Sequence, residues 1–206
     1  MITSTSLRAA PLHMVRKADG LSIELDPIQG IWSEEQYLRL TDSSNLLVEF
    51  TDGNIEVLPM PTDNHQAISQ FILLALIAFL QPFGGKVHYA PLRLQIREGK
   101  QREPDLMVLL DANDPRRQNR YWLGADLVVE VVSDDDPERD TVEKVADYAE
   151  AGIPEYWIIN PLDETISVLT LAGDAYTPRI HRRGEEATSQ LLGGFSLSVD
   201  AVFDAR

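Results

Sequence analysis

The pattern of apolar and polar stretches along the chain predicts a sheet at its centre. Two short runs rich in valine and leucine, residues 106–110 and 126–132, are bounded by polar loops. Apolar runs of this length are typical of strands that are covered on both faces. We therefore expect two neighbouring buried strands, with other elements packed against both sides of their sheet.

The N-terminal half begins with a helix and a hairpin. Ser33 and Gln36 have the spacing of a capping box, which opens a short helix through Leu40. Residues 46–50 and 55–58 flank an Asp-Gly turn, and this pattern predicts a β-hairpin.

A long apolar helix follows the hairpin. Asp63 or Asn64 can cap its start, and the pattern continues to about Gln81. The apolar stretch at its middle, residues 71–80, is well short of the roughly 20 residues that span a bilayer. We expect a core helix and no membrane partner. Two further strands are predicted after it, at residues 86–90 and 92–97.

The C-terminal half adds another helix and another hairpin. Asp136 as the N-cap and Pro137 in the first turn begin a helix that ends near Ala151. Its apolar stripe is predicted to comprise four residues: Val142, Val145, Ala146 and Ala149. Residues 155–160 and 165–171 predict the hairpin, in which we assign Tyr156 and Trp157 to the core rather than to a base-stacking platform. The fold class that follows is α/β, with a central mixed sheet flanked by helices.

Length and composition fit a single domain. The chain has 206 residues, enough to bury a sizeable core, and no cysteine. The absence of cysteine excludes disulfides and thiolate metal sites, and residues 1–20 lack the apolar core of a secretory signal. We expect a poorly ordered leader at 1–20, a single domain at 21–206, and a cytoplasmic location.

The charge of the chain argues against non-specific binding to a polyanion. The formal net charge is −15, and residues 133–150 alone carry eight acidic and two basic side chains. Two basic stretches, 116–120 and 179–183, are exceptions. Each is either an ordinary solvated turn or a contact for phosphate groups, with Arg116, Arg117, Arg182 and Arg183 as the candidate cations.

Two acids interrupt the predicted buried strands and supply the candidate chemistry. Glu130 lies inside the second valine-rich run, and Asp105 opens the first. An ionised carboxylate is costly to bury unless a cation lies nearby. A salt bridge with lysine or arginine is the plainer explanation for one such acid. Two converging carboxylates are also the usual ligands of a hard cation such as Mg²⁺ or Mn²⁺, so we expect a metal site.

The order of Pro-Asp and a strand glutamate resembles the PD-(D/E)XK phosphodiesterase superfamily, and within it the Uma-type family of restriction endonucleases. The resemblance runs from about Trp32 to Phe203. It is most specific in the segments DLVVEVVS (126–133) and EKVADYAEAGIPEYW (143–157). The superfamily places a lysine two residues after the strand glutamate, where this chain has Val132. The resemblance implies that Lys144 on the next helix takes that place.

This resemblance implies a restriction-endonuclease-like fold and magnesium-dependent hydrolysis of nucleic acid, with DNA as the expected substrate. It assigns the metal to Asp105, Glu130 and the backbone carbonyl of Val131, and catalysis to Asp105, Glu130 and Lys144. Glu49 either supports this site or points outward from an alternating strand. Lys144 either reaches the site or forms an exposed ion pair with Asp140.

For His65, a capping role or a local hydrogen bond is favoured over catalysis. A homodimer is compatible with the sequence. The alternative function is a catalytically inactive member of the fold that serves as a protein-interaction or regulatory module, which the acidity and Val132 favour.

Overall fold

The computed structural model describes residues 13–15, 22–24, 28–44 and 46–205. The expected leader at 1–20 falls outside the described residues except for His13–Val15, which forms strand β1 and pairs with β2 (Ser22–Glu24). The helices of the described chain are α1 (Glu34–Asp42), α2 (Asp63–Leu80), α3 (Lys144–Glu150) and α4 (Val199–Phe203).

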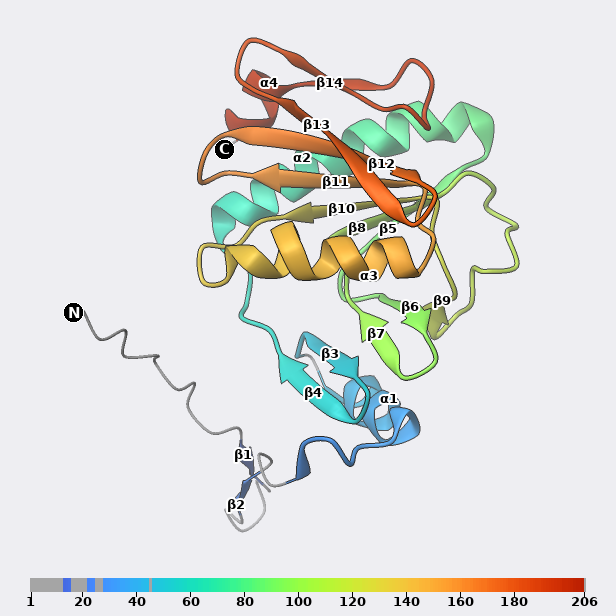
Figure 1. Cartoon of the computed structure of the whole chain (residues 1–206), viewed down its shortest axis with the longest axis vertical. Coiled ribbons are helices and arrows are strands. Elements are labelled where there is room, and N and C mark those ends of the chain that lie inside the picture. Colours follow the sequence, from blue (N-terminus) through green and yellow to red (C-terminus); the bar gives the residue numbers. More distant parts are fainter. Residues whose placement is uncertain (1–12, 16–21, 25–27, 45, 206) are drawn as a thin grey trace, which may run out of the picture.

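A six-stranded mixed sheet forms the centre of the molecule (Figure 1). Its strands, in spatial order, are β13 (Ala175–His181), β12 (Thr165–Ala172), β11 (Glu155–Asn160), β10 (Leu127–Val131), β8 (Leu106–Leu109) and β5 (Lys86–Tyr89). Strands β10 and β11 are parallel, and the other neighbours are antiparallel. The expected α/β architecture with a central mixed sheet is confirmed.

A second, five-stranded sheet lies beside the first, below it in Figure 1. Its strands, in spatial order, are β4 (Asn54–Val57), β3 (Val48–Thr51), β7 (Lys100–Arg102), β6 (Arg93–Arg97) and β9 (Tyr121–Trp122). A short pair, β14 (Glu186–Thr188) and β15 (Ser196–Ser198), lies near α4. The β3–β4 hairpin is confirmed, whereas β7, β9, β13 and the pairs β1–β2 and β14–β15 were not predicted.

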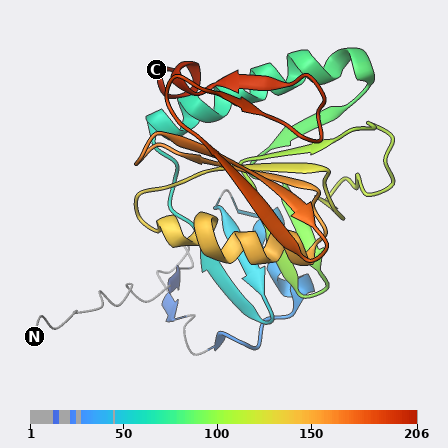
Figure 2. The same cartoon turned by 45° about the horizontal axis from the view of Figure 1, so that its top comes forward.

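The large sheet is covered on both faces, as the valine-rich runs predict. Figure 2 shows α2 on one side of the sheet and α3 on the other. The inner face of α2 packs against one side of the sheet through Ile68, Ile72, Leu76 and Leu80. Tyr148 of α3 and two side chains of the small sheet, Leu94 and Trp122, pack against the other side. Tyr156 and Trp157 are buried, so their assignment to the core is confirmed.

Helix α2 is a core helix on its inner face. By length and composition alone, the stretch Asp63–Phe83 is apolar enough to cross a membrane. Its outer face leaves Leu74 and Ile77 exposed to solvent. The residue that caps α2 is Thr62, which accepts a hydrogen bond from the His65 backbone N–H, and not Asp63 or Asn64. The capping box of α1, Ser33 with Gln36, forms as predicted.

Candidate active site

The alternation of side chains along β10 determines where its acid points. Leu127, Val129 and Val131 belong to the core on the α2 side of the sheet, while Val128 belongs to the core on the α3 side. Because successive strand residues face opposite sides, Glu130 faces α3. The acid is therefore directed into the space between the large sheet, α3 and the small sheet.

Glu130 is 2% exposed and uses both carboxylate oxygens. Oε1 lies 2.9 Å from the Lys144 Nζ and accepts a hydrogen bond from the Tyr148 hydroxyl. Oε2 accepts the backbone N–H of Asp105 at 3.2 Å. The buried carboxylate thus has the cation that its position in the sequence requires.

Asp105 precedes β8 and is joined to the end of β10. Its Oδ2 accepts the backbone N–H of Val131 at 2.7 Å, and the Nε2 of His65 lies 3.1 Å from the same oxygen. Together with the hydrogen bond to Glu130, these contacts bring the two predicted acids to one point of the sheet. The structure thus places Asp105, Glu130 and the Val131 backbone side by side.

Lys144 is shared by three carboxylates. Its Nζ lies 2.9 Å from Glu130, 3.0 Å from Asp140 and 3.7 Å from Glu49. The residue is only 4% exposed. The expected pair with Asp140 exists, but it is buried, so the interpretation of Lys144 as an exposed surface pair is wrong. The ammonium does reach the strand glutamate, as the alternative interpretation states.

Glu49 lies on β3 and is 3% exposed, so it does not point outward. Its Oε1 accepts the backbone N–H of Glu103 at 3.2 Å, and the Arg102 Nε lies 3.5 Å from its Oε2. It contacts Lys144 from the side of the small sheet. Glu49 therefore supports the lysine, but it lines a separate cavity rather than the one that contains Asp105 and Glu130.

A π-helical turn precedes α3 and positions its buried side chains. Helical backbone begins at Pro137, as predicted, and residues Arg139–Glu143 form the wide turn. The hydroxyl of Tyr156 donates a hydrogen bond to the backbone carbonyl of Asp140 at 2.8 Å. Turns of this type are frequent at functional sites. Here the turn directs Asp140 and Lys144 together toward β10.

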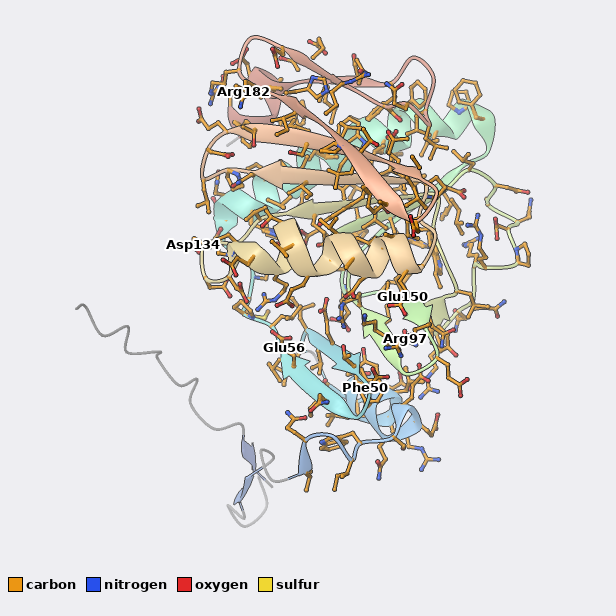
Figure 3. All side chains as sticks on the ribbon, viewed as in Figure 1. Phe50, Glu56, Arg97, Asp134, Glu150 and Arg182 are labelled. Atoms are coloured by element: carbon orange, nitrogen blue, oxygen red, sulfur yellow. The ribbon has the colours of Figure 1, made fainter. Side chains whose placement is uncertain are left out.

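The predicted apolar stripe of this helix is confirmed at Val145, which packs against the core, but is wrong at Val142 and Ala146, which are exposed. Val142 is 62% exposed, whereas Asp140, Lys144, Asp147 and Tyr148 are buried. The helix turns a polar face inward because that face meets Glu130 and the cations Lys100 and Arg102, which pair with Asp147. Figure 3 shows Glu150 of the same helix above Arg97 of the small sheet, and this pair is separated by 2.9 Å.

His65 lies at the site, although the sequence predicted only a capping role or a local hydrogen bond for it. The local hydrogen bond that we expected is present, between Nδ1 and Ser69 at 3.5 Å, but Nε2 contacts Asp105. Burial alone lowers the pKa of His65, but the hydrogen bond to Asp105, the charges of Asp105 and Asp140, and the Val131 backbone together raise it above its ordinary value. A histidine in the first turn after a cap carries no sequence signal for this contact.

The electrostatics of the site favour additional positive charge. Burial raises the pKa of Glu130, with Lys144 opposing the shift and Asp105 and Asp140 adding to it. Burial likewise raises the pKa of Asp140. Burial lowers the pKa of Lys144, but Glu130, Glu49 and Asp140 outweigh it and raise the pKa well above its ordinary value. One ammonium stays protonated and cannot neutralise all of these acids.

A pocket of about 310 Å³ opens onto this cluster. Asp105, Glu130, Asp140, Lys144 and His65 line its polar part. The apolar wall is contributed by Leu47, Leu58, Pro59, Met60, Pro61, Ala90 and Pro91. Arg139 also lines the pocket, 3.0 Å from Glu56. The site residues are therefore within reach of a ligand despite their burial.

The donor set agrees in its chemistry with a hard cation, but side chains alone do not form a complete site. Within the part of the chain that the structure describes, no three His, Asp or Glu side chains converge closely enough to hold a metal ion. The predicted ligands are two carboxylates and one carbonyl, and Mg²⁺ commonly keeps several waters. Asp105, one of these ligands, already contacts a second possible cation, the imidazole of His65, at 3.1 Å.

Glu155 is a buried acid of a different kind. It is fully buried and accepts hydrogen bonds from the Trp157 Nε1 at 2.7 Å, the Ser189 hydroxyl at 2.6 Å, and the backbone N–H groups of Gln190 and Leu191 at 2.7 and 2.9 Å. These neutral donors hold the 189–192 loop against β11. Glu155 is accordingly a structural acid.

Comparison with known proteins points to one family and one fold. The sequence matches the Uma2 family, described as "Putative restriction endonuclease", over residues 34–200. A crystal structure of a putative nuclease belonging to DUF820 from Anabaena variabilis ATCC 29413 superposes with a TM-score of 0.71. The two are 18% identical, and the match covers 84% of this chain and 97% of the other. A search of curated proteins found no match.

The shared ammonium predicts an asymmetry between two substitutions. We expect Lys144→Met to lower the free energy of unfolding by about 3–5 kcal/mol, because it leaves buried carboxylates without their cation. We expect Glu130→Gln to change the free energy of unfolding by less than about 1 kcal/mol. Lys144 would still be paired with Asp140 and Glu49, and the substitution removes the repulsion between the carboxylates of residues 130 and 105. Urea denaturation in chelator measures both.

Lys100→Met is the matched control for this prediction. Lys100 also pairs with acids of α3, but its side chain is 13% exposed, against 5% for Lys144. We expect Lys100→Met to lower the free energy of unfolding by less than Lys144→Met does. Equal losses for Lys144→Met and Glu130→Gln would show that the two form a simple pair rather than part of a shared network.

Proposed function

This chain belongs to the Uma2 family, described as "Putative restriction endonuclease", and on that premise we propose that it is a metal-dependent nuclease that hydrolyses phosphodiester bonds of nucleic acid, with DNA as the expected substrate. The observation that carries the proposal is the convergence of Asp105, Glu130 and Lys144 on one pocket. The two acids suit the binding of a cation, and the ammonium of Lys144 beside them suits the binding of a phosphate.

The cofactor in this proposal is Mg²⁺ or Mn²⁺. Asp105, Glu130 and the backbone carbonyl of Val131 would hold it, with water completing its coordination. When bound, the ion supplies positive charge to the scissile phosphate and lowers the pKa of attacking water. The approach of Asp105 to Glu130 and the contact of His65 with Asp105 support the assignment, since two acids that meet at one point favour a cation there.

The chain's own residues position and balance the charge of the site. Lys144 orients Glu130 and adds positive charge at the wall of the pocket, where developing negative charge on a phosphate is stabilised. His65 holds the Asp105 carboxylate at Oδ2. Arg139 lines the same pocket and is paired with Glu56. If this ion pair opens, the guanidinium can donate hydrogen bonds to a phosphate oxygen of the substrate.

Tyr156 acts as a positioning residue in this scheme. Its hydroxyl holds the carbonyl of Asp140 in the π-helical turn, and that turn sets the direction of Lys144. Tyr148 has a parallel role, because its hydroxyl holds the Glu130 oxygen that also meets Lys144.

Cleavage assays test the proposed function directly. We expect the parent protein to cut DNA or RNA in Mg²⁺ or Mn²⁺ and not in chelator. Asp105→Asn and Glu130→Gln should each reduce the rate at least about 100-fold, because each removes charge where the reaction develops it. Asp174→Asn, an exposed acid on the β12–β13 turn, is the control and should cut like the parent. No cleavage of either nucleic acid in any metal would favour an interaction module instead.

Metal binding should also be visible as stability. The parent should gain about 2.7 kcal/mol in the free energy of unfolding at a free ion concentration one hundred times the dissociation constant. Glu130→Gln should lose most of this gain, because it removes a predicted ligand. Thermal unfolding in chelator and in Mg²⁺ or Mn²⁺ measures the difference. A parent that ignores the ions would contradict the assigned ligands.

Tyr156→Phe tests positioning against stability. Loss of the hydroxyl should cost about 1 kcal/mol and also lower the cleavage rate, because the turn that directs Lys144 relaxes. Tyr176→Phe is a matched control, since the Tyr176 hydroxyl also donates to a backbone carbonyl, that of Ile153 at 2.7 Å. We expect a similar loss of stability and an unchanged rate. Equal rates in both variants would make Tyr156 merely structural.

A further inference from the structure

Most cations of this acidic protein are neutralised by its own carboxylates. Among the described residues, the lysines and arginines in ion pairs are Arg39, Arg93, Arg97, Lys100, Arg102, Arg116, Arg120, Arg139, Lys144 and Arg183. Arg116 and Arg183, two of the candidate phosphate contacts, are therefore already paired with carboxylates. The stretch Arg179–His181 is moreover part of β13 rather than a loop. The cations without an ion pair in that part of the chain are Lys86, Arg117, Arg179 and Arg182.

One of these cations, Arg117, lines a pocket, and a second, Lys86, lies two residues before the pocket residue His88 on β5. A cavity of about 320 Å³ is lined by Arg117, His88, Trp122 and the amide side chains of Asn113, Gln118 and Asn119. The rings of His88 and Trp122 pack with their centroids 5.2 Å apart. Arg117 uses Nη1 for the carbonyl of Ala112 at 2.9 Å, which leaves its other donors for a ligand. The cavity is polar and rich in donors.

The cavity is lined by one cation that has no ion pair, Arg117, and the charge of a second, Lys86, also acts on His88. Burial lowers the pKa of His88, and the charges of Lys86 and Arg117 lower it further, with no carboxylate opposing them. Asp114 lines the cavity too, but it is bound by Arg116 at 2.7 Å. In a chain with a net charge of −15, positive charge without a partner beside a cavity is an unusual feature. It favours an anionic ligand.

The cavity adjoins the candidate active site. One turn separates the two, because Ala90 and Pro91 line the active-site pocket while His88 and Leu92 line the second cavity. Asp105 is tied to the same turn, since its carbonyl accepts the Ala90 backbone N–H at 3.1 Å. An extended ligand that enters one pocket can therefore continue across the turn into the other.

We propose that the cavity around Arg117 and His88 binds a backbone phosphate of the nucleic-acid strand, next to the phosphate at the active site. The inference rests on the proposed nuclease function and deepens it. A nucleic-acid strand carries one anion per nucleotide, and a chain with a net charge of −15 repels such a polyanion unless local cations receive it. Arg117 and Lys86 supply the charge, and the amide groups at the cavity offer hydrogen bonds to the phosphate or its sugar.

The test measures binding of fluorescent DNA and RNA oligonucleotides to the full chain in chelator, so that no strand is cut. Arg117→Gln and Lys86→Gln should each weaken binding severalfold and reduce the slope of log K against log salt by about one. Arg117→Lys should restore part of the affinity, because it keeps the charge. Thermal unfolding checks that each variant is folded.

Arg182→Gln is the matched control. Arg182 is equally free of ion pairs, but it lies at the upper left in Figure 3, across the molecule from the loop that carries Arg117, at the right in Figure 1. Its substitution changes the net charge by the same amount and should leave binding unchanged. Equal weakening by Arg117→Gln and Arg182→Gln would overturn the inference, as would a parent that binds neither oligonucleotide at low salt.

The cleavage assay separates this inference from the proposed function. If the parent cuts nucleic acid while Arg117→Gln and Lys86→Gln bind and cut as the parent does, the cavity has no role and the nuclease function stands. If Arg117→Gln selectively weakens binding while the parent cuts nothing in any metal, the phosphate site stands and the nuclease function fails.

Discussion

The ammonium of Lys144, buried among Glu49, Glu130 and Asp140, is the interaction on which the site depends. It joins the small sheet, the large sheet and the helix that carries it, so the three layers meet at one charge. An isolated carboxylate in this position is too costly to remain ionised, and a lysine without carboxylates would lose its proton. Each group thus permits the burial of the others, and together they retain an excess of negative charge that faces the pocket.

The sequence was enough to identify Glu130 as a buried acid, but not to predict which face of the following helix packs against it. Glu130 interrupts a valine-rich strand, and the cost of burying it was enough to predict a nearby cation. The hydrophobic stripe of the following helix failed as a guide, because that helix buries Asp140, Lys144 and Asp147 and exposes Val142. Periodicity assumes that apolar side chains face inward. It has no means of detecting a polar face that is satisfied by acidic and basic partners on β10 and β7.

Long-range pairing explains the other misses. Strands β7 and β9 have only three and two residues and acquire their conformation from their neighbours in the small sheet. His65 meets Asp105 only because the start of α2 and the start of β8 come together in space. Glu155 and Glu130 both follow the pattern of an acid in a buried strand. Only their partners, neutral donors for one and a lysine for the other, distinguish a structural acid from a candidate ligand.

The number of residues in the π-helical turn at Arg139–Glu143, and not only their identity, sets the direction of the side chains on α3. A turn of this kind accommodates one residue more than an α-helical turn, and each residue of an α-helix rotates the chain by about 100°. Deleting a single residue within 139–143 could restore an unbroken α-helix and keep every buried side chain of α3 in the sequence. The reach of that helix toward Glu130 would nevertheless be lost or would have to be recovered by a full repacking. Alignments of related chains across this stretch therefore bear on function through gaps as well as through substitutions.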